Sequence, residues 1–220
     1  MTPRPQKKMN CILGVDFDNT LVDYDAVFLK TAKARGLIRN DVGMDKKNIR
    51  DVIRQLPDGE KKWQELQARV YGQDMNEAVL IDGVEDFFQI CGALGIEAYI
   101  ISHKTQFAAQ DIDNIDLRQV ALGWMKQNNF FDPKGIGLSP DRVFFESTRQ
   151  DKIRRIKELG CTCFIDDLQE IFLEESFPRG VQQILYDPHG RNSRLTHLKI
   201  FQTWKEIKEY FYENSELLSH

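Results

Sequence analysis

Hydrophobic residues follow two alternating patterns along most of the chain. Short apolar runs of strand length occur at residues 12–17, 96–102, 143–145, 162–165 and 183–186. Apolar residues at helical spacing occur at residues 84–94, 117–125, 153–159 and 204–211, with Gly95 and Gly160 as stop signals. Strands that alternate with helices form βαβ units, so we predict an α/β fold. We expect a Rossmann-like three-layer core with a mostly parallel sheet.

One stretch interrupts this alternation. Between residues 24 and 80 there is no convincing strand, and the apolar spacing predicts three helices, near residues 24–31, 48–56 and 63–71. Gly36, the Pro57-Asp58-Gly59 turn and Gly72 mark their ends. We therefore predict a small all-α insertion at residues 23–80, a core at residues 11–22 and 81–212, and flexible termini at residues 1–10 and 213–220.

Composition and charge exclude several classes of protein. Hydrophobic residues make up 41% of the 220 positions, which is ordinary for a soluble globular chain. The net charge is −4 without a long block of like charge, which argues against nucleic acid or a membrane surface as a partner. No apolar run approaches the length of a membrane span, and residues 1–10 lack the apolar centre of a secretory signal. We expect a cytoplasmic protein, and its oligomeric state stays open.

The four cysteines fit this compartment. Cys11, Cys91, Cys161 and Cys163 all lie in or beside apolar segments, and the sequence contains no Cys-x-x-Cys. We therefore expect small buried thiols in a reducing compartment, with neither a zinc site nor disulfides.

Two aspartates end the first predicted strand. Asp16 and Asp18 are spaced i and i+2, so on an extended strand their side chains point to the same side. Two carboxylates so placed can hold a hard divalent cation, and one of them can attack a substrate. The alternative is a buried strand that ends in an acidic turn.

Polar residues also follow the later strands. Ser102 and His103 follow the second strand, and Asp166 and Asp167 follow the strand at residues 162–165. Lys152 begins a helix just after the strand at residues 143–145. Because ligands of open parallel sheets bind at the carboxyl ends of the strands, these groups should gather at one edge. Together they predict a Mg²⁺ site beside a phosphate site.

These residues resemble the four motifs of the haloacid dehalogenase-like (HAD-like) hydrolase superfamily. Asp16-Phe17-Asp18-Asn19-Thr20 resembles motif I, Ser102 motif II, Lys152 motif III and Asp166-Asp167 the paired-acid form of motif IV. The motifs occur in the order of the family and cover about residues 11–170.

The resemblance implies roles for these residues. Asp16 would be the nucleophile that forms an aspartyl-phosphate, and Asp18 would protonate the leaving oxygen and then activate water. Ser102 and Lys152 would hold phosphoryl oxygens, with His103 and Thr20 as further phosphate contacts. Thr20 could instead orient Asp18 or cap the turn. Mg²⁺ would be held by Asp16, Asp18 and Asp167, with Asp166 as a second choice for the last ligand.

The helical insertion matches, by position, the C1-type cap of this family, which closes over the site and selects the substrate. Candidate substrate contacts in the cap are Tyr24, Arg50, Arg54 and Arg69. Their alternative is to serve as solvated helix faces or core aromatics.

The resemblance implies a Mg²⁺-dependent phosphomonoester hydrolase that acts on a small phosphorylated metabolite. The acid at position 18 is typical of the phosphatase branch rather than of the dehalogenases. Residues 184–188 and 201–207 further resemble the ending of some 5′(3′)-nucleotidase-like members. Phosphoryl transfer to another hydroxyl, as in phosphomutases, and a non-catalytic binding or regulatory protein are the alternatives.

Overall fold

The computed structural model describes residues 11–39, 45–111, 113–192 and 198–214. The predicted flexible termini lie outside these residues, except Glu213 and Asn214. The chain divides into two compact units. Of the described residues, the sheet unit contains 11–21, Ile81–His103, 129–192 and 198–214, and the helical unit contains those within Val22–Leu80 and Lys104–Asn128.

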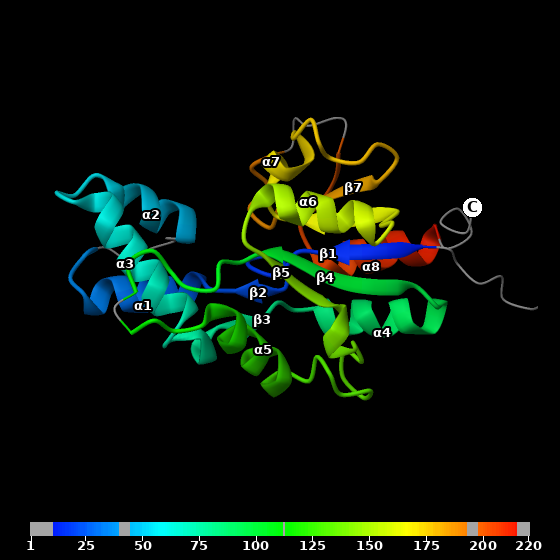
Figure 1. Cartoon of the computed structure of the whole chain (residues 1–220), viewed down its shortest axis with the longest axis horizontal. Helices are drawn as coiled ribbons and strands as arrows, with labels where there is room; N and C mark the ends of the chain where they lie inside the picture. Colours follow the sequence, from blue (N-terminus) through cyan, green and yellow to red (C-terminus); the bar gives the residue numbers. More distant parts are fainter. Residues whose placement is uncertain (1–10, 40–44, 112, 193–197, 215–220) are drawn as a thin grey trace, which may run out of the picture. The chain divides into compact units, whose positions relative to one another are not determined.

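A six-stranded parallel sheet forms the centre of the sheet unit (Figure 1). Its order is β5-β4-β1-β6-β7-β8. The strands are β1 (Ile12–Val15), β4 (Glu97–His103), β5 (Val143–Glu146), β6 (Cys163–Asp166), β7 (Gln182–Tyr186) and β8 (Lys199–Phe201). All five pairings in this sheet are parallel. The predicted α/β fold with a parallel sheet is therefore confirmed.

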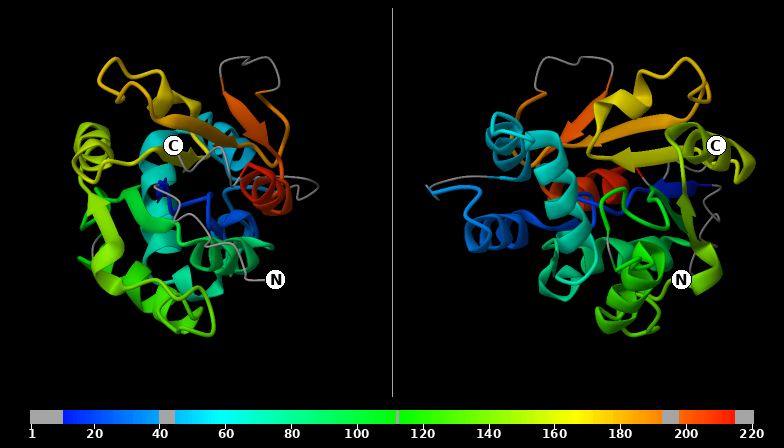
Figure 2. Two further views of the ribbon diagram at one scale, coloured as in Figure 1. Left: turned by 90° about the vertical axis from the view of Figure 1, so that its right-hand side faces the viewer. Right: turned by 60° about the vertical axis from the view of Figure 1, so that its left-hand side comes forward.

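Helices cover both faces of this sheet. They are α4 (Val84–Leu94), α6 (Arg149–Glu158), α7 (Gln169–Phe172) and α8 (Trp204–Glu213), with a short 3₁₀ helix η2 (Pro140–Arg142) before β5. Figures 1 and 2 show α6 on one face of the sheet and α4 with α8 on the other. On the α4 and α8 side, the Phe87 ring lies 4.9 Å from the Trp204 ring and 5.1 Å from the Phe211 ring.

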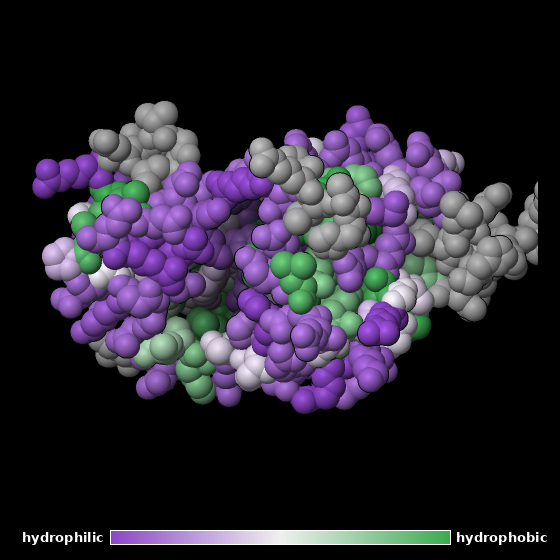
Figure 3. Space-filling model, turned by 90° about the horizontal axis from the view of Figure 1, so that it is seen from above, coloured by the Kyte–Doolittle hydropathy of each residue, from purple (hydrophilic) through white to green (hydrophobic). Residues whose placement is uncertain are grey.

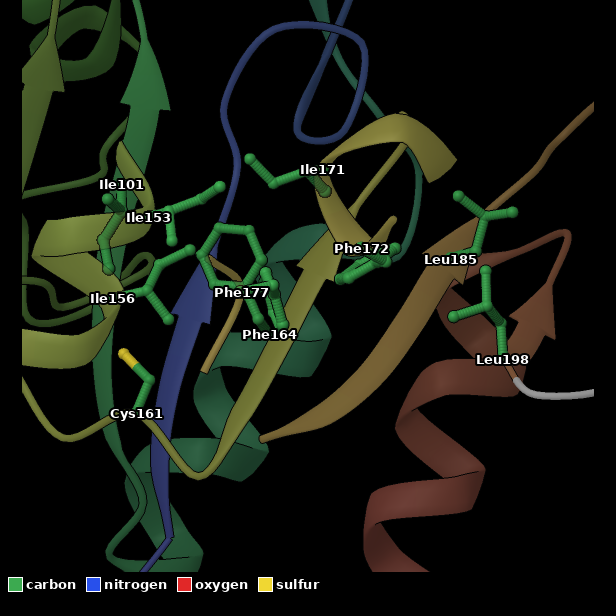
Figure 4. Packing of buried hydrophobic residues seen from close by; sticks show 10 residues of the cluster. All are labelled: Ile101, Ile153, Ile156, Cys161, Phe164, Ile171, Phe172, Phe177, Leu185 and Leu198. Atoms are coloured by element: carbon green, nitrogen blue, oxygen red, sulfur yellow. The ribbon is translucent and has the colours of Figure 1, made fainter. Parts of the chain in front are cut away.

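The core on the α6 side is packed around Phe164. Its buried residues are Ile101, Ile153, Ile156, Cys161, Phe164, Ile171, Phe172, Phe177, Leu185 and Leu198 (Figure 4). Phe164 of β6 lies against Gly14 of β1, where an added Cβ would be only 2.5 Å from the phenylalanine ring. A residue with a side chain at position 14 would therefore push the ring away, which explains the glycine next to the Asp16 strand end.

The helical unit contains α1 (Asp25–Ala34), α2 (Lys46–Arg54), α3 (Gly59–Tyr71), η1 (Met75–Glu77) and α5 (Leu117–Gln127). The three helices predicted between residues 24 and 80 are thus present. The stacked rings of Phe28 and Trp63, 5.1 Å apart, join α1 to α3. A two-stranded antiparallel pair, β2 (Val22–Asp23) and β3 (Val79–Leu80), also belongs to this unit.

Residues 104–128 join the helical unit, whereas the sequence-based boundaries left them in the core. Two contacts within the unit account for this. The Trp124 indole on α5 donates a hydrogen bond to the Ala78 carbonyl (3.0 Å), and the Lys104 ammonium lies 4.9 Å from the centre of the Tyr71 ring. Both contacts are long-range, so the local apolar spacing gave no sign of them.

The hydrophilic surface and the buried cysteines agree with what the sequence predicts. The face in Figure 3 is mainly hydrophilic, and its hydrophobic side chains lie in small separate areas. Among the helices that the structure describes, none combines the length and the apolar character needed to cross a membrane. The four cysteines are free and buried, as predicted, and burial raises the pKa of the Cys161 thiol to about 12.

Candidate functional site

The first motif carboxylate lies directly beyond β1. Strand β1 ends at Val15, earlier than the predicted run to residue 17, but the Asp16 amide continues the pairing by donating to Ile165 O (2.9 Å). Alternation along the strand places Asp16 on the same face as Gly14, which is the face that packs against Phe164. Only 5% of Asp16 is exposed. A carboxylate this deeply buried needs a charged or hydrogen-bonding partner.

Lys152 supplies that partner. Thr148 caps α6 by accepting a hydrogen bond from the Asp151 amide (3.0 Å), so Lys152 lies in the first turn of the helix. Its ammonium nitrogen is 2.5 Å from Asp16 Oδ1 and 2.6 Å from Asp166 Oδ2. A cation is disfavoured near a helix N-terminus by the helix dipole, and these two carboxylates offset that effect.

Burial shifts the acid–base equilibria of this group of side chains. Burial opposes the positive charge of Lys152, but the neighbouring Asp16 and Asp166 carboxylates outweigh it and raise the Lys152 pKa above its ordinary value. Burial also raises the pKa of the Asp166 carboxyl to about 6, although the Lys152 charge acts in the opposite direction. The second oxygen of Asp166, Oδ1, accepts a hydrogen bond from the Leu168 amide (2.9 Å).

Thr20 connects two of the carboxylates. Its hydroxyl oxygen accepts a hydrogen bond from the Asp167 amide (3.1 Å) and lies 3.3 Å from Asp167 Oδ1 and 3.5 Å from Asp16 Oδ2. A hydroxyl has one hydrogen, so it donates to one of these carboxylates at a time. These contacts join Thr20 to Asp16 and Asp167, and the alternative that Thr20 orients Asp18 stays a prediction. Thr20 is fully buried and orients the metal-ligand candidates, and its predicted contact with phosphate stays a prediction.

The donor set fits a divalent cation. Asp16, Asp166 and Asp167 each offer a carboxylate oxygen, and these oxygens lie within 4.8 Å of one another. When all are ionised, three carboxylates and the Lys152 ammonium leave two negative charges, which an ion such as Mg²⁺ would neutralise. Mg²⁺ prefers oxygen ligands of this kind. Asp16 would hold it together with Asp166 or Asp167, and which of these two binds it directly stays a prediction.

Asp18 lies farther along the same loop. It is half-buried, and Asn19 follows it in a left-handed backbone conformation (φ 61°) that turns the chain. Within the part of the chain that the structure describes, the Asp18 carboxylate is not a member of the three-carboxylate cluster. Its predicted roles as metal ligand and acid/base therefore remain predictions.

The second predicted motif ends β4, which lies beside β1. Ser102 is buried and is paired with Phe145 of β5 in the sheet. His103 is exposed, and its Nε2 lies 3.0 Å from the Ser147 carbonyl oxygen. Because a carbonyl only accepts, Nε2 carries the hydrogen in this contact. The ring of His103 is thus held against the loop that precedes α6.

The predicted cap contacts are all in the helical unit, where each has a partner. Tyr24 is buried and its hydroxyl donates to the Met75 sulfur (3.4 Å), so it is a core aromatic. The three arginines form ion pairs within this unit: Arg50 with Asp51, Arg54 with Glu60 and Arg69 with Asp74. Their contact with a substrate stays a prediction.

Trp204 supports the motif I loop and was not anticipated as part of the site. Its indole nitrogen donates to the Thr20 carbonyl (2.9 Å), and the side chain is fully buried. The sequence indicated only that Trp204 belongs to an apolar helix face. No local signal could have paired a residue of the last helix with the turn after the first strand.

Sequence comparisons find no relatives, whereas structural comparisons do. No protein-family model matches the chain, and no curated protein matches it in sequence. A HAD hydrolase of family IA, variant 3, from Entamoeba histolytica has a TM-score of 0.58 at 15% identity, over 96% of this chain and 100% of that one. A HAD family hydrolase from Deinococcus radiodurans, solved with bound phosphate and sodium, has a TM-score of 0.56 at 15% identity, over 97% and 99%.

A third structure agrees with these two. A predicted phosphoglycolate phosphatase from Haemophilus somnus has a TM-score of 0.54 at 14% identity, over 94% of this chain and 99% of that one. The chain has the haloacid dehalogenase-like hydrolase fold. The resemblance drawn from four short motifs is thus confirmed at the level of the fold. In this HAD-like fold, Asp16, Ser102 and Asp166 lie at or just beyond the carboxyl ends of three adjacent strands, β1, β4 and β6.

Proposed function

We propose that the protein is a Mg²⁺-dependent phosphomonoester hydrolase that acts through an aspartyl-phosphate on Asp16. The observation that carries this proposal is the Lys152 ammonium between Asp16 and Asp166, with Asp167 beside them. A structural ion pair needs one carboxylate for its lysine, whereas here two carboxylates contact Lys152 and a third lies beside them. The surplus negative charge would balance a divalent cation, and the cation with Lys152 would neutralise a phosphoryl group.

Asp16 suits the role of nucleophile. Its Oδ1 is held by Lys152 at 2.5 Å, whereas its Oδ2 has the longer 3.5 Å contact with the Thr20 hydroxyl. Lys152 thus fixes Oδ1, whereas Oδ2 has only a weak contact and can attack phosphorus. When bound, Mg²⁺ would neutralise charge between the carboxylate and the phosphoryl oxygens, which otherwise repel each other.

The other groups would act on the phosphoryl oxygens and on the leaving group. Asp18 would give a proton to the leaving oxygen and later take one from the attacking water, and such help contributes about 10²–10⁴-fold. Ser102 would donate a hydrogen bond to a phosphoryl oxygen, and Lys152 would add positive charge. His103 is the second candidate for a phosphate contact at the end of β4.

The helical unit would act as the cap. A cap over the site excludes water and favours small substrates, so we expect a small phosphorylated metabolite of the cytoplasm. The three candidate arginines form ion pairs inside the helical unit, but their side chains are 35–45% exposed, which leaves N–H groups for a substrate.

Release of inorganic phosphate tests this function. We would measure it for a panel of sugar phosphates and nucleoside monophosphates, with Mg²⁺ and with EDTA. Asp16→Asn should reduce release to background, because an amide does not attack phosphorus. Asp141→Asn, at an exposed aspartate of η2, is the matched control and should keep wild-type release.

The same assay separates the alternatives. Hydrolysis requires free phosphate in proportion to the substrate lost, whereas transfer to another hydroxyl consumes substrate without free phosphate. A protein that binds phosphate esters but releases none with Mg²⁺ would be a binding module, and the proposal would then be abandoned.

A further inference from the structure

A cavity of about 540 Å³ lies in the sheet unit at the amino ends of β6 and β7. Thr162 and Val181, the residues directly before these strands, line it. Asp166 is at the other end of β6, and the four residues of this strand span about 13 Å. In Figure 4, Cys161 of the cavity lies near the start of β6 and Ile171 of α7 lies beyond its arrowhead. The cavity is therefore separate from the carboxylate site.

The rim of the cavity carries two cations. Lys157, in the last turn of α6, and Arg179, before β7, both line it and are exposed. Neither forms an ion pair with any residue that the structure describes. The three arginines of α6 differ from these two residues, because Arg149, Arg154 and Arg155 are all paired with carboxylates. Positive charge at this cavity is thus left uncompensated.

The lining of the cavity next to these cations is mixed. Pro178 and Val181 supply partly buried apolar side chains, beside the polar residues Thr162 and Ser176. Cys161 and Phe177 also border the cavity, but their side chains belong to the buried core. A cationic rim beside apolar side chains matches a molecule with an anionic head and a small apolar body, and the volume is in the range of small-molecule sites.

We propose that this cavity is a second ligand site, distinct from the carboxylate cluster, that binds a small organic anion. Lys157 and Arg179 bind the phosphate, phosphonate or carboxylate head. Pro178 and Val181 contact the apolar body. Because the ligand binds the folded chain, it stabilises the fold in proportion to its occupancy.

Phenylphosphonate is a suitable probe, because its phosphorus–carbon bond resists hydrolysis. Backbone amide shifts would be followed by NMR in Asp16→Asn protein without Mg²⁺, at constant ionic strength set with chloride. We expect saturable shifts at Thr162, Gly180 and Val181. The double variant Lys157→Gln, Arg179→Gln should weaken this binding at least tenfold, while its spectrum away from the cavity stays that of the folded protein.

Lys134→Gln with Lys126→Gln is the matched control, because both lysines are exposed and neither lines the cavity. This variant should bind as tightly as the Asp16→Asn parent. Shifts confined to residues 16–20 and 102, or equal weakening in both double variants, would overturn the proposal. The readout does not depend on turnover, so a failure of the proposed hydrolase activity is distinguishable from a failure of this site.

Discussion

The Lys152 ammonium lies 2.5 Å from Oδ1 of Asp16, although 136 positions separate the two residues in the sequence. This contact joins α6 to the end of β1, and a second contact of the same ammonium, 2.6 Å from Asp166 Oδ2, joins both to β6. The side chain is almost fully buried. The positive charge of Lys152 therefore connects α6, β1 and β6, so both the stability and the chemistry of the site should depend on this residue.

Replacement of Lys152 by methionine should destabilise the protein. The substitution leaves two carboxylates buried without their cation, and breaking a buried pair in this way costs about 3–5 kcal/mol. Urea denaturation without metal would measure the free energy of unfolding. Arg149 lies in the same turn of α6 as Lys152 and forms a more exposed ion pair with Glu174. Arg149→Met removes this pair and should lower the free energy of unfolding by at most about 1 kcal/mol. Equal losses in the two variants would contradict the role of Lys152.

Thr20→Val should weaken metal binding. Valine keeps the shape of threonine but removes the hydroxyl that contacts Asp16 and Asp167, and loss of such an orienting contact lowers metal affinity by about 10–100-fold. Calorimetric titration with Mg²⁺ would measure this, and Thr20→Ser should restore the affinity. Thr31→Val is a matched control, since it removes a hydrogen bond to Asp74 (3.0 Å) in the helical unit. Metal affinity unchanged in Thr20→Val would refute the orienting role.

The indole hydrogen bonds of Trp204 and Trp124 can be compared for their effects on stability and on Mg²⁺ affinity. Trp204→Phe leaves the buried Thr20 carbonyl without its donor, and Trp124→Phe does the same to the Ala78 carbonyl. An unsatisfied buried acceptor costs about 1–3 kcal/mol, so both variants should be less stable. Only Trp204→Phe should also lower Mg²⁺ affinity, because Thr20 belongs to the motif I loop. If both variants lower the affinity alike, the effect is one of general stability and the anchoring role of Trp204 fails.

The cap of α8 should make stability depend on pH. Hydrogen bonds from the Gln202 and Thr203 amides lower the pKa of the Glu206 carboxyl. Because the pKa is lowered on folding, ionised Glu206 stabilises the folded state. This contribution to the free energy of unfolding is complete above the unfolded-state pKa, near 4.3, and is lost as the pH falls through the folded-state pKa.

The free energy of unfolding should therefore differ between wild type and Glu206→Gln at about pH 7, and the difference should shrink as the pH falls below the unfolded-state pKa and through the folded-state pKa. Urea denaturation across this range is the measurement. Thr203→Ala, which removes the hydroxyl that accepts the Glu206 amide (3.2 Å), should cost about 0.5–2 kcal/mol. A difference between wild type and Glu206→Gln that is the same at every pH would contradict this assignment.

Local patterns were enough to predict the longer helices, most strands of the parallel sheet and the motif positions. Helix α4 ends at Gly95 and α6 is followed by Gly160, and both glycines have a positive φ, 71° and 66°, that other residues rarely adopt. The strands of the sheet were found because apolar runs signal buried parallel strands. Since the carboxyl ends of such strands share one edge, the gathering of Asp16, Lys152 and Asp166 followed from their order.

Features that depend on partners far away in the chain could not be predicted from the sequence. The two-residue strands β2 and β3 are too short to show a period, and β8 has only three residues. Residues 104–128 join the helical unit through side chains such as Trp124. The hydrogen bond from Trp204 to the Thr20 carbonyl likewise joins residues that are 184 positions apart. Sequence spacing carries no information about such contacts.

The most direct test of the central claim is to trap the phosphorylated enzyme. Wild-type protein would be mixed with Mg²⁺ and an accepted phosphomonoester, quenched in acid during turnover and digested. Trypsin should release residues 9–30 as one peptide, because no lysine or arginine lies between Lys8 and Lys30. We predict a phosphate on this peptide at Asp16, and none in the Asp16→Asn variant. Phosphate release at the full rate with no phosphorylated form of this peptide, or an unchanged rate in Asp16→Asn, would contradict the account.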